Sequence, residues 1–280
     1  MIDLLISPFH FEYMIKAILI SSLVGGVCAF LSSYLMLKGW SLIGDALSHS
    51  VVPGVAIAYV FSLPYAIGAF FSGVLAAISI LIIKIITNLR EDSIIGFIFT
   101  TFFALGLLII SLNPTQISVQ EIIFGNILAI ANDDIIQVGI IIIICIGLLF
   151  VFWKDLLLVF FDEIHASSIG INVLAYKILF FSMLSACVVA ALQTVGAILV
   201  IAMVITPGAT GYLLSDRFGV IASIATILGI ASSAIGVYIS YFFDGVTGGI
   251  IVSLQTLLFL LAFIFSPKYG LLRRYLKVQK

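Results

Sequence analysis

The sequence has very few charged residues. Of its 280 residues, only 9% are Asp, Glu, Lys or Arg, whereas 63% are hydrophobic. A soluble domain has about 25% charged residues, and no soluble fold could bury this much apolar surface. The composition therefore excludes a soluble protein and indicates a helical protein that crosses a membrane many times. The net charge of -1 gives no indication of nucleic-acid binding.

Motifs for nucleotide binding and hydrolysis are also absent. No Lys follows a Gly, so there is no Walker A loop, and neither Gly-x-Ser-x-Gly nor His-Glu-x-x-His occurs. Cys28, Cys145 and Cys187 lie far apart in apolar runs without a Cys-x-x-Cys pair, so we interpret them as packed apolar side chains. We therefore expect no enzymatic activity here. If ATP drives this protein, another chain hydrolyses it.

What the sequence does contain is a series of long apolar runs. A bilayer crossing needs about 20 residues, and the runs predict an all-α, polytopic bundle in a single domain, residues 1–280. Pro53-Gly54 interrupts the second run, and broken helices at membrane depth are tolerated where they line a cavity. The nine expected segments are residues 13–37, 41–62, 64–88, 93–112, 135–153, 173–192, 194–214, 219–241 and 246–266.

The Lys and Arg residues predict the orientation. Cytoplasmic connections of membrane proteins carry an excess of these residues. With one choice of cytoplasmic side, every Lys and Arg except Lys16 lies on or near that side. This choice puts the N-terminus outside and the C-terminus inside, and nine crossings fit it; seven would also fit if one hairpin were re-entrant. The cytoplasmic segments are then residues 38–40, 89–92, 154–172, 215–218 and 267–280.

Asp45 and His49 are two ionisable residues inside an apolar segment. Charge within a membrane segment is costly and is by default a functional hypothesis. Residues four apart share one face of a helix, and Ser41 and Ser48 extend this polar face, so we predict that both serines line a pore. A carboxylate and an imidazole suit Mn, Fe or Zn. The alternative is a satisfied structural hydrogen bond between helices.

Two ligands hold a metal weakly, which transport requires because the ion must leave again. A symmetric dimer would bring two Asp45–His49 pairs together around an axis.

The cytoplasmic stretch 154–172 is too charged to span a membrane and too apolar for a free loop. We interpret it as a short helix on the membrane face. Asp162, Glu163, Ala166 and Gly170 follow a pattern that fits a cleft on an ATPase subunit, because small residues allow close approach and Gly can end the helix. Any interfacial helix could show the same pattern.

Two further stretches stand out. Asn113 to Gly125 predicts a short external amphipathic helix after a turn. Pro207-Gly208 predicts a break in the segment 194–214, either a kink in a packing helix or a hinge in a pore wall.

Three runs carry a resemblance to a known family. Gly39-Trp-Ser-Leu-Ile-Gly-Asp-Ala-Leu-Ser-His-Ser-Val-Val-Pro-Gly54 resembles the signature of bacterial metal ABC-importer permeases, the manganese/iron/zinc branch. Val195 to Thr210 is similar to that family's second signature, and Gln120 to Leu128 looks like a third. The likeness is greatest to the chelated manganese/iron permeases of Gram-negative bacteria. One departure is Gly208, where many relatives would have Ala.

The resemblance implies a homodimer in the bacterial inner membrane, with two cytoplasmic ATPase subunits. It implies a separate external metal-binding protein, which we expect near Glu121, and a fold similar to vitamin B12-type importer permeases. Asp45 and His49 match positions taken to touch the metal.

We therefore expect a permease for Mn2+ or Fe2+ with no permanently bound cofactor. Zn2+ transport stays open. An ATPase-independent channel or secondary transporter and an intramembrane metalloenzyme are the alternatives from other classes.

Overall fold

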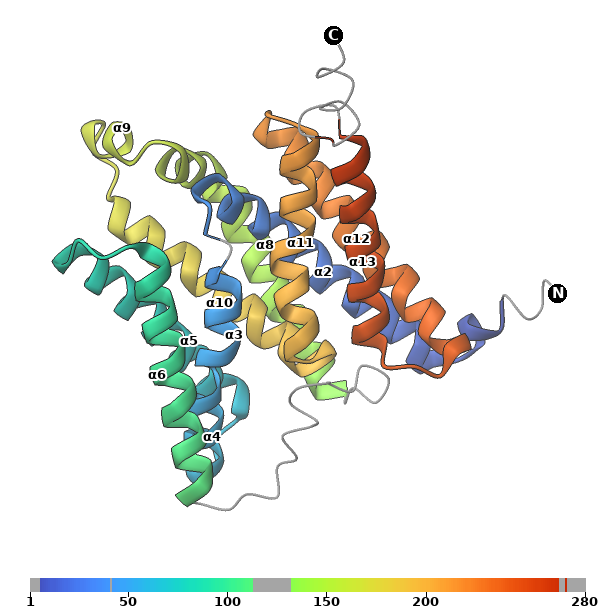
Figure 1. Ribbon diagram of the computed structural model, residues 1–280. Coiled ribbons are helices and arrows are strands. Elements are labelled where there is room, and N and C mark those ends of the chain that lie inside the picture. Colours follow the sequence, from blue (N-terminus) through green and yellow to red (C-terminus); the bar gives the residue numbers. More distant parts are fainter. Residues whose placement is uncertain (1–5, 41, 113–131, 267–269, 271–280) are drawn as a thin grey trace, which may run out of the picture.

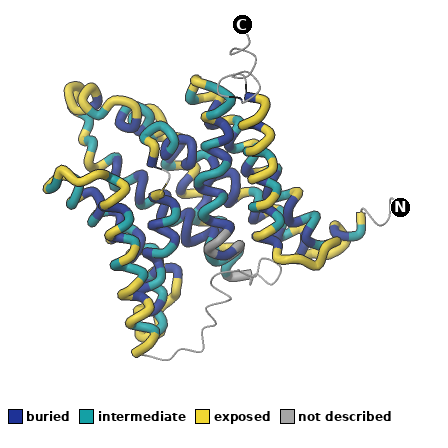
Figure 2. Tube along the Cα trace, viewed as in Figure 1, coloured by how far each residue is buried: buried dark blue, intermediate teal, exposed yellow. Residues whose placement is uncertain are grey.

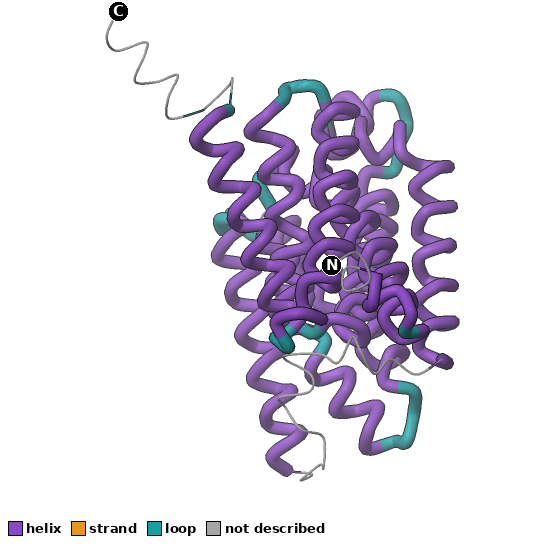
Figure 3. Tube along the Cα trace, turned by 90° about the vertical axis from the view of Figure 1, so that its right-hand side faces the viewer, coloured by secondary structure: helices purple, strands orange, loops and turns teal. Residues whose placement is uncertain are grey.

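The computed structural model describes residues 6–40, 42–112, 132–266 and 270. Among these residues every regular element is a helix, and the long helices form one bundle (Figure 1, Figure 3). The elements are the short 3-10 helix η1 (Ser7–His10) and the α-helices α2 (Glu12–Lys38), α3 (Leu42–Ser50), α4 (Val52–Val60), α5 (Tyr65–Ile86), α6 (Glu91–Leu112), α8 (Asn132–Phe161), α9 (Glu163–Ser168), α10 (Val173–Val195), α11 (Ala197–Leu214), α12 (Phe218–Phe243) and α13 (Thr247–Phe265).

The predicted membrane segments correspond to these helices. Within the described ranges, eight spans are long and apolar enough to cross a membrane, and α3 and α4 together make one of them. The ninth predicted segment is α11, a shorter apolar helix of 18 residues. The prediction of an all-α membrane bundle is confirmed, and the second segment is interrupted at Val51, just before Pro53.

The helix α2 lies at the centre of the bundle, where it contacts α8, α10, α11 and α12. The helices α3 to α6 pack on one side of this centre and α12 and α13 on the other (Figure 1). Buried residues concentrate where α2, α10 and α11 meet (Figure 2). In contrast, α6 and α8 carry many exposed apolar side chains. Such exposed apolar side chains suit contact with lipid or with another membrane chain.

Glycine allows two pairs of helices to approach closely. A Cβ atom on Gly229 of α12 would overlap the Gly25 carbonyl of α2, and one on Gly54 of α4 would overlap the Gly68 carbonyl of α5. Membrane helices associate mainly through such close packing, since lipid is as apolar as their side chains. The second contact fixes α4, and with it the direction of the chain leaving α3.

Two predicted helix boundaries are wrong. The stretch 154–172 is not one separate helix, because α8 continues to Phe161 and only the six residues of α9 form a short helix of their own. The break at Pro207 does not occur either, since α11 is continuous through it. Proline removes one backbone donor, and a neighbouring helix provides polar contacts here: the Gly208 N–H donates to Ser32 Oγ at 3.1 Å, and Ser32 Oγ donates to the Ile205 carbonyl at 3.3 Å.

The same contact explains the glycine at position 208. A Cβ atom there would overlap the Ser32 hydroxyl and lie 2.7 Å from the Ser32 carbonyl oxygen. The close crossing of α2 and α11 therefore requires Gly at this position in this chain.

Candidate functional site

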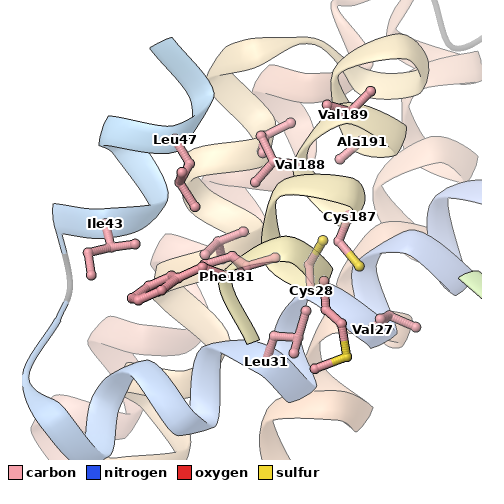
Figure 4. Packing of buried hydrophobic residues seen from close by; sticks show 14 of the residues in the cluster. Val27, Cys28, Leu31, Ile43, Leu47, Phe181, Cys187, Val188, Val189 and Ala191 are labelled. Carbon is pink, nitrogen blue, oxygen red and sulfur yellow. The ribbon is translucent and has the colours of Figure 1, made fainter. Parts of the chain in front are cut away.

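The short helix α3 has two different faces. Its apolar face carries Ile43 and Leu47, which are buried at 2% and 0% exposure and lie toward α10 and Phe181 (Figure 4). The opposite face carries Asp45 and His49, whose side chains are 38% and 30% exposed. Because Ile43 and Leu47 share one face of the helix, their burial leaves the face of Asp45 and His49 partly exposed.

Asp45 and His49 contact each other directly. The His49 Nδ1 atom lies 3.2 Å from Asp45 Oδ1 and 3.1 Å from the Asp45 carbonyl oxygen. Both neighbours are acceptors, so neutral His49 carries its proton on Nδ1. The lone pair then lies on Nε2, where an imidazole can bind a metal while its other nitrogen donates to a carboxylate.

Aromatic rings from α6 enclose the His49 imidazole. Phe99 and Phe103 lie edge-on to it, with ring centroids at 4.9 and 5.4 Å, and stack on each other at 6.2 Å. The helices α3 and α6 are in contact. These rings restrict the orientation of the imidazole and exclude water from its sides. Sequence analysis missed both residues, since a phenylalanine in a membrane segment gives no local signal.

The two serines predicted to line the pore have different outcomes. Ser48 is buried at 3% exposure, and its hydroxyl donates to the Gly44 carbonyl at 2.8 Å. In the single protomer it therefore lies inside α3's packing surface and not beside the exposed pair. Ser41 lies outside the described residues, as do Glu121 and the predicted external helix at 113–125.

A cavity of about 350 Å³ lies between α2, α8 and α12. Its lining is apolar apart from Ser22 and Thr226, whose hydroxyls donate to carbonyls of their own helices, those of Ile18 and Ala222. This cavity offers no charged ligand for a cation. In the described part of the chain, no group of three or more His, Cys, Asp and Glu side chains is close enough to hold a metal. Within these described residues, one protomer therefore provides a pair of ligands and not a complete site.

The second candidate region is α9, beyond the end of α8. Asp162 caps this helix by accepting the His165 N–H at 2.9 Å, and Gly170 follows it with a φ of 88°. Ala166 is fully buried, so it serves the packing of α9 onto the bundle. The short, capped helix lies at one end of the bundle (Figure 1).

Glu163 anchors α9 to two other helices. Its carboxylate lies 2.8 Å from Lys38 Nζ at the end of α2 and 2.6 Å from Lys177 Nζ of α10. Burial raises the pKa of this carboxyl, but hydrogen bonds and charges from Lys177 and Lys38 outweigh it, so the pKa lies below its ordinary value of 4.5. Glu163 is therefore ionised at neutral pH and holds α9 in place.

Residues 10–266 match the ABC 3 transport family. The chain belongs to this family. An ABC 3 permease is the membrane component of a transporter and not itself the ATPase, and the family implies ATPase and substrate-binding partners. The apolar helices and bacterial relatives of this permease place it in the bacterial inner membrane as a multi-pass protein.

Relatives of this ABC 3 permease match over nearly their full length. A probable iron transport system membrane protein of Haemophilus influenzae is 71% identical over 98% of this chain and 97% of its own. The chelated iron transport system membrane protein YfeC of Yersinia pestis is 66% identical, over 97% and 92%. The manganese transport system membrane protein MntB of Synechocystis is 48% identical, over 96% and 88%.

Solved structures share the fold. PsaBC from Streptococcus pneumoniae, in complex with Fab, matches all of both chains with 36% identity and a TM-score of 0.84. An inward-facing metal-chelate type ABC transporter matches 89% of this chain and 84% of its own with 18% identity and a TM-score of 0.68, which is likeness of fold alone. The resemblance drawn from the sequence signatures is confirmed.

Proposed function

We propose that this ABC 3 permease moves a divalent transition metal, Mn2+ or Fe2+, from an external binding protein into the cytoplasm. The names of the relatives support iron and manganese as cargo. The observation that carries the proposal is the Asp45–His49 pair, half-exposed on a helix of a membrane span. Its oxygen and nitrogen donors suit these metals, and also Zn2+.

The exposure of this pair supports a water-filled path between two copies of the chain. An Asp facing lipid at the bilayer centre costs about 2.5–3.5 kcal/mol on insertion scales. A second copy related by twofold symmetry would place two carboxylates and two imidazoles around a shared axis. Four weakly held ligands could replace the metal's hydration shell in passing and release the ion again. We therefore propose a homodimer with no permanently bound metal.

The region around α9 supports docking of the ATPase. Asp162 and Gly170 delimit a short helix at the bundle end, and Glu163 and Ala166 fix it to the bundle. We propose that each of two permease copies binds one cytoplasmic ATPase subunit there, so that hydrolysis occurs in the partner and this chain is not an enzyme. We propose that the external binding protein contacts the region of Glu121.

The test is metal uptake by the complete transporter in proteoliposomes, with ATP enclosed and the external binding protein added. We expect ATP-dependent uptake of Mn2+, reduced by competing Fe2+ or Zn2+ according to their affinities. The variants Asp45→Ala and His49→Ala should assemble with the ATPase but lose uptake. His10→Ala is the matched control, because it removes an imidazole outside α3. Uptake at the wild-type rate by both α3 variants would refute the proposed role.

A further inference from the structure

Trp40 precedes α3, which carries the candidate metal pair, and lies beside Lys177, which is bound to Glu163 of the candidate docking helix. It occupies the connection from α2 to α3 and is only 4% exposed. Its ring stacks on Phe181, with centroids 5.5 Å apart and planes at 21°, and meets Phe160 edge-on at 5.6 Å. These contacts fix the indole, and its Nε1–H donates to Glu91 Oε2. Trp40, two positions before α3, is therefore bound to the first residue of α6.

Glu91 also accepts from Lys84, the last basic residue of α5. The Lys84 ammonium lies 5.0 Å from the centre of the Trp40 indole, a cation–π distance. The contact between Trp40 and Glu91 therefore lies at the start of two helices. One is α3, which carries His49, and the other is α6, whose phenylalanine rings lie beside His49. A shift of this contact would move the imidazole and the phenylalanine rings around it.

The same indole is connected to α9. The Lys177 ammonium lies 5.8 Å from the centre of the Trp40 indole and is bound to Glu163 of α9. Lys177 is 7% exposed, and separating a buried charge from its partner is strongly unfavourable. Lys38, the second partner of Glu163, lies two residues before Trp40. A displacement of α9 would therefore move Lys177, beside the indole, and Lys38, two residues before Trp40.

We propose that Trp40 is a positioning residue for transport, which passes movements of α9 to the start of α3 and α6. The path runs from Glu163 through Lys177 to the indole, and from the indole through Glu91 to the two helices that hold the metal pair. The inference rests on the proposed function, since it describes how ATP-driven movement of α9 reaches Asp45 and His49.

The test compares metal uptake with ATP hydrolysis in the complete transporter. Trp40→Phe keeps the ring packing and removes the N–H that reaches Glu91. Glu91→Gln keeps the size of the side chain and removes the charge that accepts from Trp40 and Lys84. Asp155→Asn is the matched control, because it removes the charge of a carboxylate that accepts from Tyr176 at 2.7 Å and is no member of this path.

We expect both single variants to hydrolyse ATP at close to the wild-type rate. The number of metal ions moved per ATP should fall at least about fivefold, the lower end of coupling between sites. The double variant should be no worse than the poorer single variant, because both changes break one path. Asp155→Asn should behave as wild type.

A purely structural role gives a different result. Uptake and hydrolysis would then fall together with the melting temperature, or the losses in the double variant would multiply. Either result, or wild-type coupling in both single variants, would overturn the proposal. A wild-type transporter without ATP-dependent uptake would instead refute the proposed function.

Discussion

Replacing Asp45 by Asn separates a role in transport from a role in folding. The His49 Nδ1 to Asp45 Oδ1 distance is 3.2 Å, and the two side chains are 30% and 38% exposed. Acid–base pairs four residues apart with such exposure stabilise a helix by less than about 0.5 kcal/mol. Loss of a carboxylate that orients a metal-binding histidine costs about 10–100-fold in metal affinity. We therefore expect a large loss of transport with almost no loss of stability.

Transport is measured as the initial rate of ATP-dependent Mn2+ uptake over a range of metal concentrations. Stability is measured by thermal unfolding of the purified complex. The KM for metal should rise about tenfold or more, while the midpoint temperature of thermal unfolding should change by no more than about 2 °C. Glu12→Gln is the control, since Glu12 and Lys16 form an ion pair with the same spacing at 2.6 Å in α2. Unchanged uptake, or a loss of uptake matched by a loss of stability, would refute the reasoning.

Three other changes test the packing, the imidazole and the docking helix. Gly54→Ala puts a Cβ into the Gly68 carbonyl, and this overpacking should lower the free energy of unfolding by about 1–3 kcal/mol in a denaturant titration. Phe103→Ala removes one ring beside His49, and because an aromatic pair contributes about 0.5–1.5 kcal/mol, metal uptake at low concentration should fall about 2–10-fold. Burial raises the pKa of Glu163, but Lys177 and Lys38 outweigh this effect and hold the pKa below 4.5. The ionised carboxylate therefore stabilises the fold fully above pH 4.5, and this contribution is lost as the pH falls through the lowered pKa. The difference in melting temperature between wild type and Glu163→Gln should follow this course between pH 7 and pH 3.

The membrane spans were predictable because their cause is local. Each needs about 20 apolar residues, a property that the sequence displays directly. The end of α8 was misplaced because Lys154 and Asp155 were taken as the limit of the helix. In the structure the Lys154 ammonium lies 5.6 Å from the centre of the Trp153 ring and Asp155 accepts from Tyr176, so both charges are accommodated without ending the helix.

The break expected at Pro207 failed for a related reason. A proline in an isolated helix removes a donor and favours a kink. Here α11 stays continuous, and the Gly208 N–H donates to Ser32 of another helix, 176 positions earlier. The sequence around Pro207 contains no sign of this partner, because it depends on how α2 crosses α11.

The candidate site also combines features with a local sequence signal and contacts between distant segments. Asp45 and His49 could be paired in advance, since a spacing of four residues puts them on one face of any helix. The rings of Phe99 and Phe103, and the charges around Trp40, come from segments brought together only by the bundle. Ser48 shows the limit of helical spacing as a guide. It lies one position from His49, and this rotation of about 100° turns it into the protein core.

This difference between neighbouring positions explains how one short helix can hold a polar pair in a membrane span. Leu47 and Ser48 are buried against the bundle, so α3 cannot rotate to hide Asp45 and His49 without exposing them. The pair therefore stays partly exposed, with His49 beside the rings of α6, in any arrangement that preserves this packing. A rigid-body movement of α3 together with α6 would change what the pair faces while preserving this packing, as the proposed transport path requires.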